Sequence, residues 1–168
     1  IPDDATPEEE ERILRQAMEE AFGGSDAEGF WSWKDAYEAC EAAQVLFLKK
    51  YGRACQEKAV SPAALLSMIS RIAGLLPTHT RRSEESQNLQ QFSTPTPLAL
   101  VAAIAAGVTP DDVALEPSAG TGLMAIFAEI MGARLALNEI AETRVALLRR
   151  LFPDAVTSTH DPAIPPHY

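Results

Sequence analysis

Val113-Ala-Leu-Glu-Pro-Ser-Ala-Gly-Thr-Gly122 is the stretch that decides the fold class of this chain. A short apolar run ends in an acid, a turn of small residues follows, and residues 123–131 have the length and spacing of a helix with one buried face. The stretch therefore predicts a strand, a glycine loop and a helix over residues 122–131. Glycines let the backbone turn sharply and let a ligand approach closely. We expect the unpaired N–H groups of the first helical turn to face that ligand.

The same alternation of strand and helix extends to both sides of this stretch. Apolar periodicity and breakers predict helices over residues 96–107 and 142–151, and strands over residues 134–137 and 155–159. Strands that alternate with helices at this spacing form parallel sheets with helices on their faces. We therefore expect an α/β fold in the second half of the chain.

The first half carries three helical patterns. Thr6-Pro7-Glu8-Glu9 combines a cap residue, a proline at the first helical position and an acid three residues after the cap, and Ser32 and Ser61 begin the other two patterns. In the second pattern, the predicted apolar stripe is Ala36, Tyr37, Cys40, Ala43, Leu46 and Phe47. The chain is thus predicted to comprise a small all-α domain over residues 1–76, a polar linker over 77–91 and the α/β domain over 92–168.

Composition narrows the class of protein. The formal net charge is −10, so this piece alone is expected to bind nucleic acid weakly. No run approaches the roughly 18 apolar residues of a membrane span, and the first residues lack the blocks of a signal peptide. We therefore expect a cytoplasmic protein with no membrane partner. Cys40 and Cys55 show no metal-ligand spacing, so no metal site is predicted.

Acids beside the glycine loop indicate the ligand. Gly120-Thr-Gly122-Leu-Met-Ala125 fits a loose G-x-G-x-x-A fingerprint, and Glu139 follows Gly120 by nineteen residues, at the end of the second strand. An acid there can accept hydrogen bonds from both ribose hydroxyls of a dinucleotide or of S-adenosylmethionine. Glu116, just before the loop, would oppose a pyrophosphate but suits a ligand with an ammonium and a sulfonium. It therefore favours S-adenosylmethionine.

Three motifs together resemble a known family. Gln91-Phe-Ser-Thr-Pro95, Glu116-Pro-Ser-Ala-Gly-Thr-Gly122 and Asn138-Glu139 look like the first half of a class I S-adenosylmethionine-dependent DNA methyltransferase of the adenine-N6 type. They are most similar to bacterial and phage proteins that join such a methylase to a strawberry-notch-like helicase. The resemblance covers roughly residues 88–161. It implies a Rossmann-like methyltransferase half-domain, with parallel strands in the order 3-2-1 and flanking helices.

The resemblance also implies a role for each segment. Residues just before the helix at 96 would close over the methionine end of the cofactor, and Glu116 with the loop would hold its amino-acid part. Glu139 would hold the ribose and Ile140 would lie against the adenine. Asp161 would accept the adenine amino group. The implied cofactor-binding residues are Phe92, Thr94, Pro95, Glu116, Pro117, Ser118, Ala119, Gly120, Thr121, Gly122, Glu139, Ile140 and Asp161.

The catalytic motif of that family, Asp/Asn/Ser-Pro-Pro-Tyr/Phe, is missing. Residues 164–168 read Ile-Pro-Pro-His-Tyr, in which Ile164 cannot hydrogen-bond a target amine and His167 stands where an aromatic ring should stack on the base. We therefore predict no catalytic residue here. The expected role is the cofactor-binding part of a larger enzyme that has DNA as its substrate, with the fragment itself inactive. The open edge of the first strand is expected to allow dimerisation or aggregation.

Other interpretations of the same residues stay open. The chain could be a dinucleotide-binding oxidoreductase fragment, or a non-catalytic interaction module with a methyltransferase-like fold that docks on a basic partner through its acidic helices. Thr94-Pro95 could form only a turn before a helix, and Asp161 could only cap a turn, because Pro162 follows it.

Overall fold

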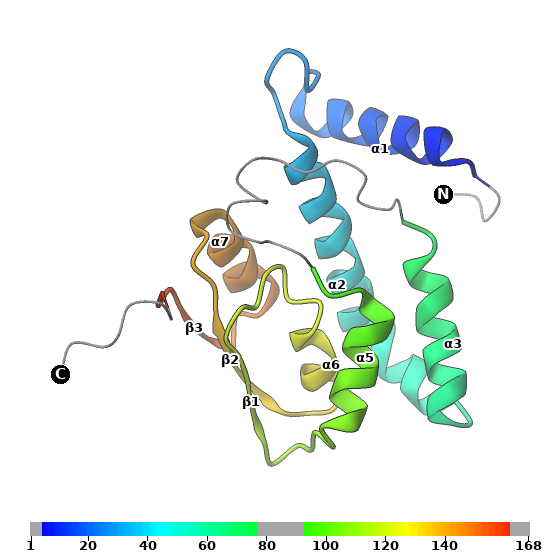
Figure 1. Cartoon of the computed structure of the whole chain (residues 1–168), viewed down its shortest axis with the longest axis vertical. Coiled ribbons are helices and arrows are strands. Elements are labelled where there is room, and N and C mark those ends of the chain that lie inside the picture. Colours follow the sequence, from blue (N-terminus) through cyan, green and yellow to red (C-terminus); the bar gives the residue numbers. More distant parts are fainter. Residues whose placement is uncertain (1–4, 77–92, 162–168) are drawn as a thin grey trace.

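A parallel sheet of three strands lies at one side of the molecule, as the sequence predicts (Figure 1). The computed structural model describes residues 5–76 and 93–161. The strands are β1 (Val113–Glu116), β2 (Arg134–Asn138) and β3 (Val156–Ser158). β2 is central, and its Ala136 pairs with Leu115 on one side and Val156 on the other. The predicted parallel order, with β2 between β1 and β3, is therefore confirmed.

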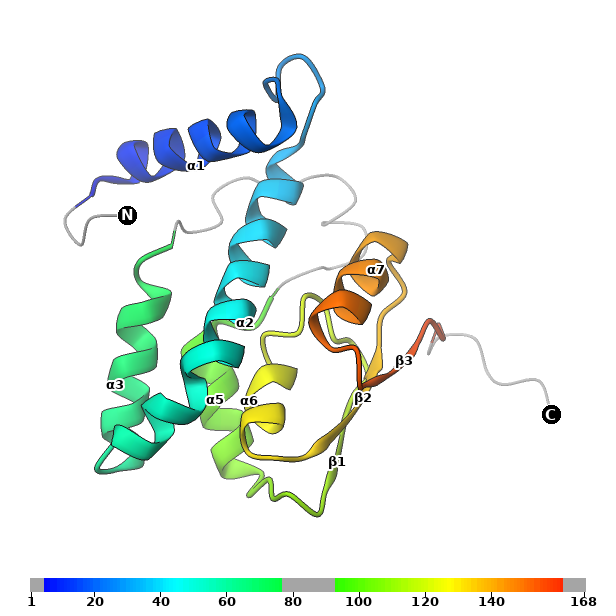
Figure 2. The same cartoon turned by 180° about the vertical axis from the view of Figure 1, so that it is seen from behind.

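Helices cover one face of this sheet (Figures 1 and 2). α6 (Ala125–Ile130) and α7 (Glu142–Leu151) contact the strands, and α5 (Thr96–Ala105) packs beside α6. Successive side chains of a strand point to opposite faces, so Leu135 and Leu137 are buried beneath the helices, while Leu115 and Val156 are 70% and 72% exposed on the other face. The result is a mixed α/β fold with one face of the sheet open among the described residues.

The helices of the first half begin and end where local signals place them. They are α1 (Pro7–Phe22), α2 (Trp33–Lys58) and α3 (Pro62–Ala73). The side chain of Thr6 accepts a hydrogen bond from Glu9 N, while the Glu9 carboxylate accepts one from Thr6 N. Ser32 and Asp35 form the same reciprocal pair at the start of α2. These capping boxes satisfy N–H groups that a helix leaves unpaired.

The largest hydrophobic core joins both halves of the chain. Val45 and Leu48 of α2 and Ile69 of α3 are at most 1% exposed and belong to the same buried cluster as Leu100 of α5 and Ile126 of α6. α1 packs on a separate, smaller cluster with the start of α2. The division into domains at residue 76 stays a prediction, but α2 and α3 bury their apolar faces against the α/β part.

The predicted apolar stripe of α2 is wrong at its second half. Ala36, Tyr37 and Cys40 are buried as predicted, but Ala43, Leu46 and Phe47 are exposed, Leu46 and Phe47 by 57% and 39%. The buried positions that the prediction missed are Glu41, Ala42, Val45, Leu48 and Gly52. The stripe follows Val45 and Leu48 because these side chains are buried in the shared core, where α2 contacts α3 and α6. In residues 5–76 and 93–161, no helix is long and apolar enough to cross a membrane.

Candidate functional site

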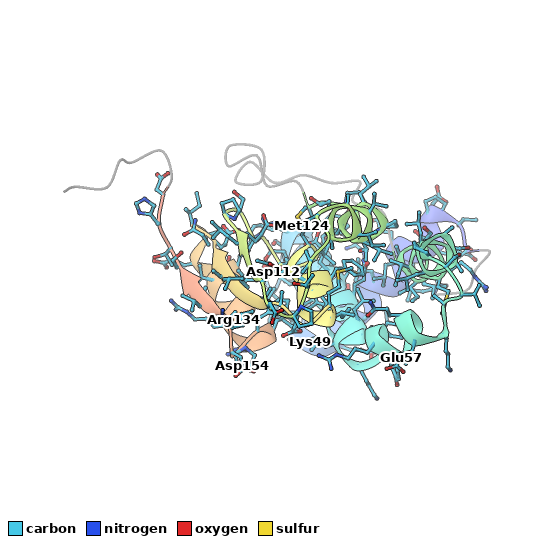
Figure 3. All side chains as sticks on the ribbon, turned by 90° about the horizontal axis from the view of Figure 1, so that it is seen from below. Lys49, Glu57, Asp112, Met124, Arg134 and Asp154 are labelled. Carbon is cyan, nitrogen blue, oxygen red and sulfur yellow. The ribbon has the colours of Figure 1, made fainter. Side chains whose placement is uncertain are left out.

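The carboxyl ends of the strands bring the predicted site residues to one edge of the sheet. Glu116 ends β1, Glu139 directly follows β2, and Asp161 follows β3. In open α/β sheets, ligands bind outside this edge. Figure 3 views the molecule from the opposite end, where Asp112, Arg134 and Asp154 mark the amino ends of the strands.

The glycine loop is held by backbone hydrogen bonds. Ala119 N donates to Asn138 O at 2.8 Å, and Gly122 N donates to Ala119 O at 2.8 Å. Gly120 and Gly122 have φ values of 55° and 89°, which side chains with a Cβ rarely adopt. The sequence therefore correctly places a tight turn here.

The helix after the loop begins later than the sequence predicts. α6 starts at Ala125, and residues 122–124 still belong to the turn. The positive φ of Gly122 is incompatible with a right-handed helix, which delays its start. The N–H groups of Gly122, Ile126 and Phe127 are already bonded within the turn, so the expectation that N–H groups face a ligand now concerns residues 123–125 and stays a prediction.

Glu139 braces the glycine loop from β2. Its side chain is 6% exposed, Oε2 accepts a hydrogen bond from Gly120 N at 2.9 Å, and Oε1 accepts one from Ala141 N at 2.9 Å. A buried carboxylate is stable only when such donors satisfy it. The acid that the sequence assigns to a ribose thus also fixes the loop to the start of α7.

Glu116 has a different environment. It is half-buried at the end of β1, and this burial raises the pKa of its carboxyl, while a hydrogen bond from the backbone of Ser118 works in the opposite direction. A carboxylate in such a position is more stable beside a cation. Pro117 and Ser118, which follow it, are exposed.

Asn138 ties the strand ends together, a role that the sequence does not reveal. Its amide nitrogen donates to Pro117 O at 3.1 Å and to His160 O at 2.8 Å. Its amide oxygen accepts from Ser158 Oγ at 2.7 Å and from His160 N at 2.8 Å. The sequence signal that could have found it is an amide side chain directly after the apolar run Leu135-Ala-Leu137, and the residue is only 9% exposed.

The remaining predicted residues lie around this edge. Thr94 is half-buried and Pro95 is exposed, just before α5, and Pro95 O accepts the first hydrogen bonds of that helix. Ile140 is 43% exposed beside Glu139, and Asp161 is half-buried. Phe92 lies outside the described residues.

α2 supplies a further acid that the sequence prediction missed. Glu41 is 3% exposed and accepts a hydrogen bond from the hydroxyl of Thr121 at 2.6 Å. It lies on the buried stripe between Tyr37 and Val45, so an acid in an apolar stripe was the available signal. One turn earlier, Glu38 accepts a hydrogen bond from Arg144 Nε at 2.6 Å, and Lys34 Nζ lies 3.2 Å from it.

Comparisons with protein-family models, with curated proteins and with solved structures found no match to this chain. The site must therefore be interpreted from its own chemistry. Within residues 5–76 and 93–161, no group of three or more His, Cys, Asp or Glu side chains could hold a metal ion. Backbone turns and carboxylates are the features that a ligand would meet at this edge.

Proposed function

We propose that the carboxyl edge of this sheet binds S-adenosylmethionine. The chain would act as the cofactor-binding part of a DNA methyltransferase, acting on adenine N6 within a larger protein with a helicase-like part. The proposed fold is a Rossmann-like methyltransferase half-domain. The parallel order of the strands, with a glycine loop directly after β1, supports this assignment.

The observation that carries the proposal is the pair of acids at the ends of adjacent strands. Glu116 is half-buried, and the raised pKa of its carboxyl means that its negative charge is poorly solvated. A ligand with an ammonium and a sulfonium would relieve that cost, whereas a pyrophosphate would increase it. Glu139 would accept hydrogen bonds from the ribose with the lone pairs that Gly120 and Ala141 leave available.

The chemistry of the whole enzyme would be transfer of the sulfonium methyl group to an exocyclic amine. S-adenosylmethionine would supply that methyl group and leave as S-adenosylhomocysteine, while Glu116 and Glu139 would hold its amino-acid and ribose parts. Positioning is the main contribution of a protein to such a step. The sequence contains no Asp/Asn/Ser-Pro-Pro-Tyr/Phe motif. The role proposed for this chain is therefore to bind the cofactor.

Calorimetric titration with S-adenosylhomocysteine tests the proposal. We expect binding by the native chain, and Glu116→Gln should weaken it about tenfold, because the variant keeps an acceptor oxygen but removes the charge that attracts the ammonium of the ligand. Glu142→Gln is the matched control, since Glu142 is an exposed acid at the first turn of α7. Absence of heat from the native chain at millimolar ligand contradicts the proposal.

One observation favours a second candidate, a dinucleotide. A Cβ built at Gly120 would lie 3.8 Å from Arg144 Nη1, so a guanidinium stands close to the loop. Its charge is offset by Glu38, which lies 2.6 Å from Nε. Titration with NAD under the same conditions separates the two: heat with NAD and none with S-adenosylhomocysteine selects the dinucleotide.

A further inference from the structure

One face of α2 contacts the loop and helix starts of the proposed site. Glu38, Glu41 and Gln44 are spaced three residues apart, so they lie on the same side of the helix. α2 runs past α5, α6 and α7, as two opposite views show (Figures 1 and 2). Its contacts with α6 and α7 confirm that these elements are neighbours.

Each of these side chains binds a different segment. Glu38 pairs with Arg144 at the first turn of α7, with side-chain exposures of 12% and 8%. Glu41 accepts the Thr121 hydroxyl of the glycine loop at 2.6 Å. Gln44 accepts the hydroxyl of Thr96, the first residue of α5 and the neighbour of Pro95.

The hydrogen bond between Glu41 and Thr121 restrains the glycine loop, the part of the site with the most backbone freedom. Thr121 is 2% exposed and stands between Gly120 and Gly122, both with positive φ. Glycines leave a chain free to adopt other conformations, so a loop of this composition needs an external constraint. Asn138 and Glu139 supply part of that constraint from the end of β2, and Glu41 adds to it from a helix eighty residues earlier in the chain.

Burying the carboxylate of Glu41 in the core costs free energy of desolvation. It lies on the buried stripe with Val45 and Leu48, where an aliphatic side chain would fill the space without desolvating a carboxylate. The acid is therefore better explained by the hydrogen bond that it accepts than by its contribution to the core. The same reasoning applies to Glu38, which is half-buried beside Arg144 and Lys34.

We propose that Glu38, Glu41 and Gln44 are positioning residues and that α2 sets the glycine loop, the start of α5 and the start of α7 in the arrangement that a ligand requires. The helical first half is then a built-in part of the ligand site. The effect on a ligand rests on the proposed function, whereas the effect on the loop does not.

Amide hydrogen exchange, read by mass spectrometry over residues 117–124, tests the effect on the loop. Glu41→Leu and Thr121→Val, the second of which keeps the size of its side chain, each remove the bond. Both should speed exchange there about tenfold, the usual consequence of losing one hydrogen bond. Glu41→Gln keeps an acceptor oxygen and should restore slow exchange. Exchange in Thr121→Val equal to that of the native chain overturns the proposal, even if Glu41→Leu fails to fold.

Lys49→Met is the matched control for α2. Lys49 Nζ lies 2.6 Å from Glu129 Oε2 of α6 and 4.5 Å from the centroid of the Phe152 ring, so this variant removes an ion pair made by none of the three positioning residues, while methionine keeps an apolar side chain beside the ring. Figure 3 labels Lys49. It should leave exchange over residues 117–124 unchanged. Equal acceleration in Lys49→Met and Thr121→Val would show that any loosening of α2 suffices, which also overturns the proposal.

Affinity for S-adenosylhomocysteine provides the second measurement. Thr121→Val and Glu41→Leu should weaken binding at least about fivefold, while Glu41→Gln should stay close to the native value. Unchanged affinity in Thr121→Val overturns the proposed effect on the ligand. A native chain that binds no S-adenosylhomocysteine contradicts the proposed function, and the exchange experiment then still decides whether α2 orders the loop.

Discussion

The carboxylate of Glu139 accepts a hydrogen bond from the backbone of Gly120, with 2.9 Å between Oε2 and N. The other oxygen accepts the N–H of Ala141 at 2.9 Å, and the residue is 6% exposed. One acid therefore joins the loop after β1 to the start of α7. This arrangement gives Glu139 a structural role that can be measured without any ligand.

Glu139→Ala should lower the free energy of unfolding by about 1–3 kcal/mol, because it leaves buried N–H groups without acceptors. Urea denaturation followed by circular dichroism measures the change. Glu142→Ala is the control, since Glu142 is exposed and its removal should cost less than about 1 kcal/mol. Equal stability of Glu139→Ala and the native chain would show that the bonds to Gly120 and Ala141 contribute little.

Gly122 should not tolerate a side chain. A Cβ there would lie 2.3 Å from Cε2 of Phe152, a ring that is 1% exposed, and φ is 89°. Overpacking and backbone strain together should make Gly122→Ala about 2–4 kcal/mol less stable.

Gly107→Ala is the matched control, because φ is 63° but a Cβ would meet nothing within 4 Å. Its cost should be backbone strain alone, about 1 kcal/mol. Similar losses in both variants would contradict the role of the Phe152 contact.

The pH dependence of stability should identify the cost of the Glu116 charge. Burial raises the pKa of this carboxyl above its ordinary value of 4.5. The folded state therefore favours the protonated form of Glu116. The stability that this preference contributes is present below pH 4.5 and is lost as the pH rises through the folded pKa. Glu116→Gln should consequently gain stability relative to the native chain between acid and neutral pH. The gain should stay below about 1 kcal/mol, because the half-buried group is partly screened by water.

Chemical denaturation of both proteins at a series of pH values measures this difference. Glu142→Gln, in which an exposed acid is changed, should show no comparable trend. A difference between Glu116→Gln and the native chain that does not vary with pH would show that burial of Glu116 carries no cost.

Local signals in the sequence predict much of this fold. The capping residues Thr6, Ser32 and Ser61 lie next to the helices that they begin, and their hydrogen bonds span three residues. The strand order follows from alternation of strands and helices along the chain. In each case the information and its consequence lie close together in sequence.

The missed features depend on contacts between distant residues. Apolar residues of α2 fit more than one stripe, and packing in the core shared with α3 and α6 selects the one that contains Val45 and Leu48. The sequence does not reveal why an acid stands within that stripe, because Thr121, the partner of Glu41, is eighty residues away. Asn138 looks like one more residue of a strand until the ends of β1 and β3 are placed beside it.

Asn138→Asp should therefore disturb the carboxyl edge more than its small size change suggests. The new carboxylate oxygen would face Pro117 O and His160 O, where the native amide nitrogen donates. Loss of these bonds and repulsion between oxygens should cost at least about 2 kcal/mol at neutral pH. Because protonation restores a donor, the loss should shrink as the pH falls. A stability difference that is small, or independent of pH, would contradict the assigned orientation of the amide.

The open edge of β1 should govern self-association. Leu115 is 70% exposed on β1, which pairs only with β2 among the described residues. A lysine on an edge strand discourages pairing between chains. Leu115→Lys should therefore reduce self-association in sedimentation velocity at increasing concentration. The unfolding free energy should change by no more than about 0.5 kcal/mol, because the position is exposed.

Leu46→Lys, on α2 and 57% exposed, removes apolar surface far from any strand and should leave association unchanged. Equal reductions in both variants would point to general hydrophobic attraction, and a native chain that stays monomeric would show that this strand edge does not associate.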